Sequence, residues 1–202
     1  MNVTMTDIKK LREMTGAGLS DCKKALAESD DMDGAVAYLR KKGQAVAAKR
    51  SDREAAEGCV LVKVADGFGA IIALKCETDF VANNADFVAL TQQILDAAVA
   101  NKCKSLEEVN ALPMGDGTVA DAVTARSGIT GEKMELDGYS YIEGDNICTY
   151  NHMNRNGLCA MVAFNAPVEA EVGKNVAMQV ASAAPVAIDE TGVPQAVKDN
   201  EI

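Results

Sequence analysis

The sequence predicts an α+β fold in which three short helices precede a body of mixed helices and strands. The first observation is that residues 6–43 contain three helix-length segments with apolar residues at helical spacing. The second is a change of period at Gly58, where β-rich runs begin. The third is charge, because residues 1–50 hold ten Lys and Arg against seven Asp and Glu, whereas residues 51–202 hold ten against twenty-three. We therefore expect a domain boundary near residue 50.

Each N-terminal segment carries its own start or stop signal. The first, TDIKKLREMTGAG, has Thr6 as its expected N-cap and Gly16 as its end. The second, LSDCKKALAES, has Ser20 as its expected N-cap. The third, DMDGAVAYLRKKG, is expected to stop at Gly43, because glycine commonly ends a helix. Residues 44–57 should then form a polar, helix-prone linker.

The body begins with two β-rich runs at 59–65 and 69–76, which flank Asp66-Gly67 as the strands of a hairpin do. An amphipathic helix should start near Asn84, and Gly128 should close a later one. Further helices are expected in SLEEV, GTVADAVTARSG, GKNVAMQVASAAP and VPQAVKDNEI, and further strands in KMELDGYSYIEG, NICTYNHM and LCAMVAFNA.

Composition argues against several classes of protein. The formal net charge of −10 is unlike a general nucleic-acid binder, which needs a basic face, so no direct nucleic-acid partner is expected. No apolar run approaches the roughly 18 residues of a membrane helix, so no membrane partner is expected either. The six cysteines contain no C-x-x-C pair and indicate free thiols in a reducing compartment, which favours a cytoplasmic location.

A search for catalytic motifs finds little. His152 is the single histidine, and neither a phosphate-binding G-x-x-x-x-G-K-[ST] loop nor a Cys/His cluster occurs. The acidic run of Asp30, Asp31 and Asp33 lacks the spacing of a calcium-binding loop. We therefore expect a protein that is not an enzyme, with no catalytic residue, no metal and no cofactor. A hydrolase built on scattered carboxylates is the remaining enzymatic alternative.

Two stretches instead suggest interaction surfaces. In TGAGLSDCKK, an exposed Leu19 near Arg12 and Lys23 could form a docking patch; alternatively, Leu19 closes the core of the small bundle. In CETDFVA, Asp79 and Phe80 follow a strand directly and could face a partner. The alternative is that Phe80 folds back over the sheet while Asp79 caps a turn or the next helix.

These two stretches, LREMTGAGLSDCKKAL and CETDFVA, resemble the elongation factor Ts family, the nucleotide-exchange factors of elongation factor Tu. EGDNICTYNH and NVAMQVASAAP resemble later segments of that family. The resemblance implies a three-helix domain like a ubiquitin-associated domain at 1–50, a linker ending at 51–57, and core subdomains at 58–130 and 131–202. The second subdomain is expected to be incomplete, because the family's coiled-coil protrusion would begin near the last residue.

The resemblance also implies which residues contact elongation factor Tu. The first motif would dock on its GTPase domain, and the second would lie near its magnesium and nucleotide site. Ser20 stands where the best-known pattern has methionine, and ITGE departs from the family's Ile-Gly-Glu stretch, which weakens a role for Ile129 or Gly131. The implied contact residues are Arg12, Leu19, Lys23, Thr78, Asp79, Phe80, Val81 and His152.

The function that follows from the resemblance is guanine-nucleotide exchange during translation elongation. Phe80 would act as a wedge, since an aromatic ring offers a large, stiff apolar area. The alternative is an adaptor of the ubiquitin-associated type that binds proteins through residues 1–50 and has no exchange activity. In a full-length chain the C-terminal region could also support a homodimer.

Overall fold

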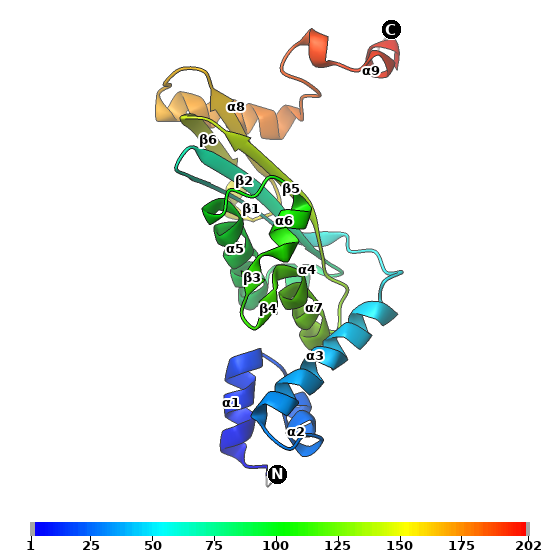
Figure 1. The fold of residues 1–202 in the computed structure, drawn as a ribbon. Coiled ribbons are helices and arrows are strands. Elements are labelled where there is room, and N and C mark those ends of the chain that lie inside the picture. Colours follow the sequence, from blue (N-terminus) through cyan, green and yellow to red (C-terminus); the bar gives the residue numbers. More distant parts are fainter. Residues whose placement is uncertain (1–2, 201–202) are drawn as a thin grey trace.

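The computed structural model describes residues 3–200 and confirms the α+β class. Three helices lie at one end of the molecule, and a body of helices and antiparallel strands lies above them (Figure 1). The helices are α1 (Met5–Thr15), α2 (Leu19–Ala27), α3 (Met32–Lys49), α4 (Asp79–Ala82), α5 (Ala85–Ala100), α6 (Leu106–Ala111), α7 (Val119–Thr130), α8 (Ala170–Ala183) and α9 (Gln195–Asn200). The strands are β1 (Glu57–Ala65), β2 (Phe68–Cys76), β3 (Pro113–Met114), β4 (Gly117–Thr118), β5 (Glu135–Glu143), β6 (Asn146–Asn151) and β7 (Cys159–Phe164).

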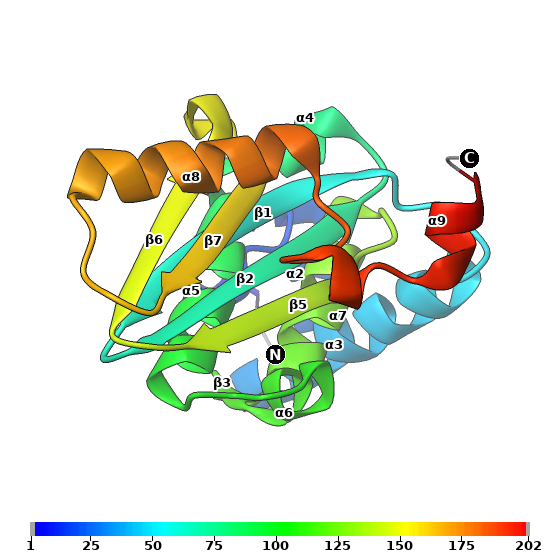
Figure 2. The ribbon, with the colours of Figure 1, turned by 90° about the horizontal axis from the view of Figure 1, so that it is seen from above.

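The main sheet is antiparallel and has the order β1-β2-β5. The predicted hairpin is confirmed: Asp66 and Gly67 both have positive φ, 48° and 73°, as a two-residue turn between twisted strands requires. β6 and β7 form a second hairpin, and α8 lies across both of its strands (Figure 2). β5 therefore lies in the same sheet as β1 and β2, although the predicted division at 130/131 assigns it to the second subdomain. That division stays a prediction.

The larger hydrophobic core lies where the three-stranded sheet meets α5, α6 and α7. Phe68 of β2 and Phe87 of α5 are fully buried there. The predicted stripe of α5 is confirmed at Phe87, Ile94 and Ala98, whereas Leu90 is only half-buried. The strand β2, which ends at the candidate site, lies between β1 and β5 and packs on α5, so it gives the residues after it a rigid base.

The N-terminal helices bury a smaller cluster of their own. Leu11 of α1 and Leu26 of α2 are fully buried in it, and Ile129 of α7 packs against its edge. The predicted first cap is wrong, because Thr4 and not Thr6 is the N-cap of α1. Its side chain accepts a hydrogen bond from the N–H of Asp7, whose carboxylate accepts one from the N–H of Thr4. Ser20 is not a cap either, since Gly18 takes that position with no side-chain hydrogen bond.

Two glycines expected to end helices lie inside them instead. α3 continues past Gly43 to Lys49, so the first part of the predicted linker is helical, and α7 continues past Gly128 until Gly131 ends it with φ 74°. Gly43 and Gly128 face each other, and a Cβ on Gly128 would collide with the Cα of Gly43. The absence of a side chain at both positions lets α3 and α7 approach closely. This requirement for glycine is steric, whereas a glycine that ends a helix is favoured for its positive φ.

Candidate functional site

The stretch that follows β2 forms a sharp corner. Thr78 has extended backbone angles and is the N-cap of α4, where its Oγ1 accepts a hydrogen bond from the N–H of Val81 at 3.4 Å. Val81 is half-buried against the core. Phe80 points the other way, with 85% of its surface exposed, which is inconsistent with the alternative that it folds back over the sheet. We refer to Thr78, Asp79, Phe80 and Val81 as the corner.

Asp79 is exposed and is not a helix cap. Thr78 caps α4, and Asn84 caps α5 by accepting a hydrogen bond from the N–H of Asp86 at 3.0 Å. The alternative role of Asp79 as a cap is therefore wrong. Asp79 and Phe80 are consecutive exposed residues in the single turn of α4, so both an acid and an aromatic side chain are accessible to a partner.

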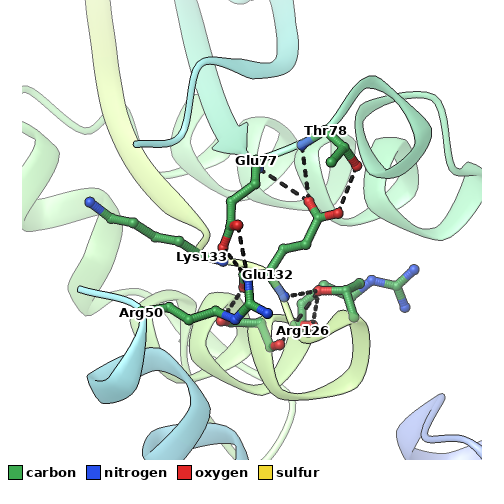
Figure 3. Close-up of polar contacts among 8 residues, drawn as sticks. Arg50, Glu77, Thr78, Arg126, Glu132 and Lys133 are labelled. Carbon is green, nitrogen blue, oxygen red and sulfur yellow. Dashed lines mark hydrogen bonds and ion pairs between the residues drawn. The ribbon is translucent and has the colours of Figure 1, made fainter. Parts of the chain in front are cut away.

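The carboxylate of Glu132 holds the backbone of the corner in place (Figure 3). It lies just after α7 and accepts hydrogen bonds from the N–H groups of Glu77 and Thr78, both at 3.1 Å. It also accepts one from the Thr78 hydroxyl at 2.6 Å. Three hydrogen bonds to one carboxylate are charge-assisted and therefore stronger than neutral ones.

The side chain of Glu77 is held in turn by two other segments (Figure 3). Nη1 of Arg50, at the end of α3, lies 2.8 Å from each carboxylate oxygen, and the N–H of Lys133 donates to the carboxylate at 2.6 Å. The Lys133 hydrogen bond, more than the Arg50 charge, lowers the pKa of Glu77, and partial burial opposes both. We call Arg50, Glu77, Thr78, Glu132 and Lys133 the corner frame.

The lowered pKa of Glu77 predicts a dependence of stability on pH. A carboxyl group with a depressed pKa in the folded state contributes stability above its unfolded pKa, near 4.5, and loses it as the pH falls through the folded pKa. We expect Glu77→Gln to be less stable than the parent chain by about 1 kcal/mol at pH 7. Urea unfolding at pH 7 and at stepwise lower pH should show this difference shrinking below about pH 4.5. A difference that stays constant with pH would contradict the assignment.

The first motif lies on the N-terminal helices. Leu19 is the first residue of α2 and is 46% exposed, while Arg12 and Lys23 are also exposed. The alternative in which Leu19 closes the bundle core is wrong, because Leu11 and Leu26 fill that core. Leu19 and two cations of the same motif are thus accessible to a partner.

His152 lies on neither of these two surfaces. It follows β6 in a short 3-10 turn (His152–Asn154), is exposed, and has its Nδ1 3.0 Å from the hydroxyl of Tyr150. The predicted contact residues therefore fall into three groups: one on α1 and α2, one at the corner, and His152 on the second hairpin. Only the four corner residues are contiguous.

Arg126 of α7 is hydrogen-bonded to the start of α5 and lies near Gly16 of the first motif. Its Nη2 donates to Asn84 Oδ1 at 2.9 Å and to Asp86 at 3.2 Å, and its Nη1 would lie 3.7 Å from a Cβ placed on Gly16. A groove of about 1060 Å³ runs beside it, between the N-terminal helices and the body. Its walls include Met14 of α1 and Leu90 of α5.

Sequence reasoning missed Arg50, Glu132 and Arg126 as parts of this site. Their roles arise from contacts between segments that are distant in the chain, and no local period marks them. The ITGE stretch contains Glu132 and was the one available signal, but its departure from the family's Ile-Gly-Glu pattern left the contacts of residues 129–132 open.

Neither a metal site nor a membrane span is found in the part of the chain that the structure describes. Within residues 3–200, no group of three or more His, Cys, Asp or Glu side chains could hold a metal ion. No helix in the same range is long and apolar enough to cross a membrane.

Comparison with known proteins points to one family. The family model described as Elongation factor TS matches residues 77–202. A protein named Elongation factor Ts from Bacteroides fragilis is 71% identical over 203 residues, which cover 100% of this chain and 62% of that protein. Proteins of the same name from Parabacteroides distasonis and Porphyromonas gingivalis are 66% and 54% identical, and the matched residues cover 61% and 74% of their lengths. The chain thus spans about three fifths of the length of the Bacteroides relative.

Proposed function

Because this chain belongs to the elongation factor Ts family, we propose that it is a guanine-nucleotide exchange factor that binds elongation factor Tu and promotes the release of GDP during translation elongation. The observation that carries the proposal is the corner, where Phe80 is 85% exposed on a single turn held by the Glu132 carboxylate. Burial of a large apolar side chain by a partner is most favourable when a rigid backbone already holds it in water, because little conformational entropy is then lost on binding.

The corner promotes nucleotide release through its partner and needs no chemistry of its own. Magnesium neutralises the phosphates of a bound nucleotide, so disturbing the elements around the ion weakens nucleotide binding. In the proposed complex, Phe80 inserts between such elements of the GTPase domain, and Asp79 places a negative charge beside it. The energy for this displacement comes from burial of the ring and from contacts made elsewhere on the chain.

The exposed first motif supplies such a contact in the proposal. Leu19 gives an apolar anchor, while Arg12 and Lys23 give charge complementarity to an acidic partner surface. His152, exposed on the second hairpin, is proposed as a third, polar contact. Separated contacts on one protein add to affinity only when the partner meets them together, so their spacing matters as much as their chemistry.

Leu19→Asp is expected to weaken association with elongation factor Tu by at least about tenfold, because it removes the apolar anchor. Stability should hardly change, since Leu19 is half-exposed and an acid is favourable in the first turn of α2. Met5→Asp is a matched control, because Met5 is the first residue of α1 and is 62% exposed. Binding titrations and melting curves on both variants test this. A loss of roughly 2–5 kcal/mol in stability would show that Leu19 belongs to the core.

The direct test of the proposal is release of labelled GDP from purified elongation factor Tu, with and without this chain. The exchange function predicts that the chain speeds the loss of label and that the rate saturates with chain concentration. The adaptor alternative predicts binding with no change in the release rate. That second outcome would refute the proposal.

A further inference from the structure

We propose that Glu132 is a positioning residue for the corner: its carboxylate sets the direction in which α4 leaves the strand and so presents Phe80 to the partner. This inference rests on the proposed exchange function for its effect on activity. Its structural half, that Glu132 fixes the corner, can be tested without any partner.

The corner backbone depends on Glu132 because the sheet ends just before it. Pairing of β2 with β1 stops at Cys76, and pairing with β5 stops at Lys75. The N–H groups of Glu77 and Thr78 lie beyond both ladders, and within residues 3–200 Glu132 is the acceptor found for each. A buried or half-buried N–H without an acceptor is costly, so losing this carboxylate would leave the two residues free to reorient.

Thr78 transmits this anchoring to α4. Its hydroxyl donates to Glu132 and accepts from the N–H of Val81, so one oxygen joins the carboxylate to the first turn of the helix. α4 has only four residues, and a helix that short has no stability of its own. Its direction, and with it the direction of Phe80, is therefore set by this cap and by the packing of Val81 and Ala82.

The segment after β2 and the segment after α7 are hydrogen-bonded to each other in both directions. The N–H groups of Glu77 and Thr78 donate to the carboxylate of Glu132, while the N–H of Lys133 donates to the carboxylate of Glu77. Glu132 is itself fixed to the end of α7, because its N–H donates to Thr130 Oγ1 and its carbonyl accepts from the Ser127 hydroxyl. Turning the corner would therefore break hydrogen bonds to Glu132 and Lys133, which directly follow α7.

Loss of the Glu132 carboxylate should change the maximal rate of GDP release more than the affinity for the partner. With the whole 202-residue chain, Glu132→Ala should lower the maximal rate of GDP release by about tenfold, as expected for losing charge-assisted hydrogen bonds. The half-saturating concentration should change by less than about threefold, because the first motif is untouched. Thr78→Val removes the hydroxyl that joins Glu132 to α4, so it should lower the maximal rate in the same direction as Glu132→Ala. Glu143→Ala is a control, since it removes only an exposed ion pair with Lys104.

A double variant separates positioning from general destabilisation. If Glu132 acts through Phe80, then Glu132→Ala should cause no further loss of release in a Phe80→Ala background. Equal fractional losses in both backgrounds, or wild-type release by Glu132→Ala alone, would overturn the inference.

Amide hydrogen exchange supplies the readout that needs no partner. In Glu132→Ala, the amides of Glu77, Thr78 and Val81 should exchange at least about tenfold faster, while amides in the centre of β2 keep their protection. Unchanged protection at the corner would overturn the inference even if the chain proved to be an exchange factor. Conversely, if the parent chain failed to speed GDP release from elongation factor Tu, the proposed function would be refuted. The structural test by hydrogen exchange would still stand.

Discussion

Phe80→Ala is expected to lower stimulated GDP release by roughly one to three orders of magnitude while the chain stays folded. Loss of an aromatic anchor typically costs about 2–4 kcal/mol at an interface, and each 1.4 kcal/mol is about tenfold in rate. Phe80 is 85% exposed, so it contributes little to the core of its own chain. Stopped-flow release at several chain concentrations, with melting curves on the same proteins, gives both quantities.

Two further variants show whether the effect is specific to the corner. Ile188→Ala removes an apolar side chain that is fully exposed and lies outside the corner, so it should leave release unchanged. Asp79→Ala should act in the same direction as Phe80→Ala but more weakly, because salt and water screen an exposed carboxylate. Near-wild-type release by a folded Phe80→Ala would rule out the wedge, although membership of the family would stand.

Gly128→Ala is expected to destabilise the chain by about 1–3 kcal/mol, because the new methyl group would collide with the Cα of Gly43 and force α3 away from α7. Helix propensity alone predicts the opposite sign, since Ala is about 1 kcal/mol more favourable than Gly inside a helix. The outcome therefore decides between local preference and packing. Urea unfolding of the variant measures it directly.

The same substitution at an open glycine is the control. A Cβ on Gly157 would meet nothing within 4 Å, so Gly157→Ala should change stability by less than about 0.5 kcal/mol. Displacing α3 should also move Arg50 and the first motif, so Gly128→Ala should weaken binding to elongation factor Tu beyond its effect on folding. If Gly128→Ala stabilised the chain, the close approach of the two helices would be wrong.

Local signals in the sequence were enough to predict most elements of the fold. The hairpin at Asp66-Gly67 and the buried stripe of α5 follow from turn chemistry and from period, and the structure confirms both. The ends of α3 and α7 did not follow, because a glycine that stops a helix and a glycine that lets two helices touch look alike in sequence. What distinguishes Gly43 and Gly128 is a contact between distant segments.

The candidate site, too, could be predicted from the sequence only in part. The pattern around Phe80 marked the corner but left its exposure open, since a strand-to-helix turn can bury an aromatic residue as well as present it. The structure decides for exposure. Arg50 and Glu132 of the corner frame could not be predicted, because they act on the corner from segments far away in the chain, and a single charged residue carries no signal of its partner.

If this chain and GDP oppose each other on elongation factor Tu, their effects on each other's affinity must be reciprocal. By a thermodynamic cycle, if the chain weakens GDP binding by some factor, GDP must weaken binding of the chain by the same factor. The measurement is the affinity of the chain for nucleotide-free and for GDP-saturated elongation factor Tu, beside the affinity of GDP with and without the chain. We expect equal factors in both directions, each at least about tenfold, with Phe80→Ala reducing both together. Equal affinity of the chain for nucleotide-free and for GDP-saturated elongation factor Tu would contradict this mechanism.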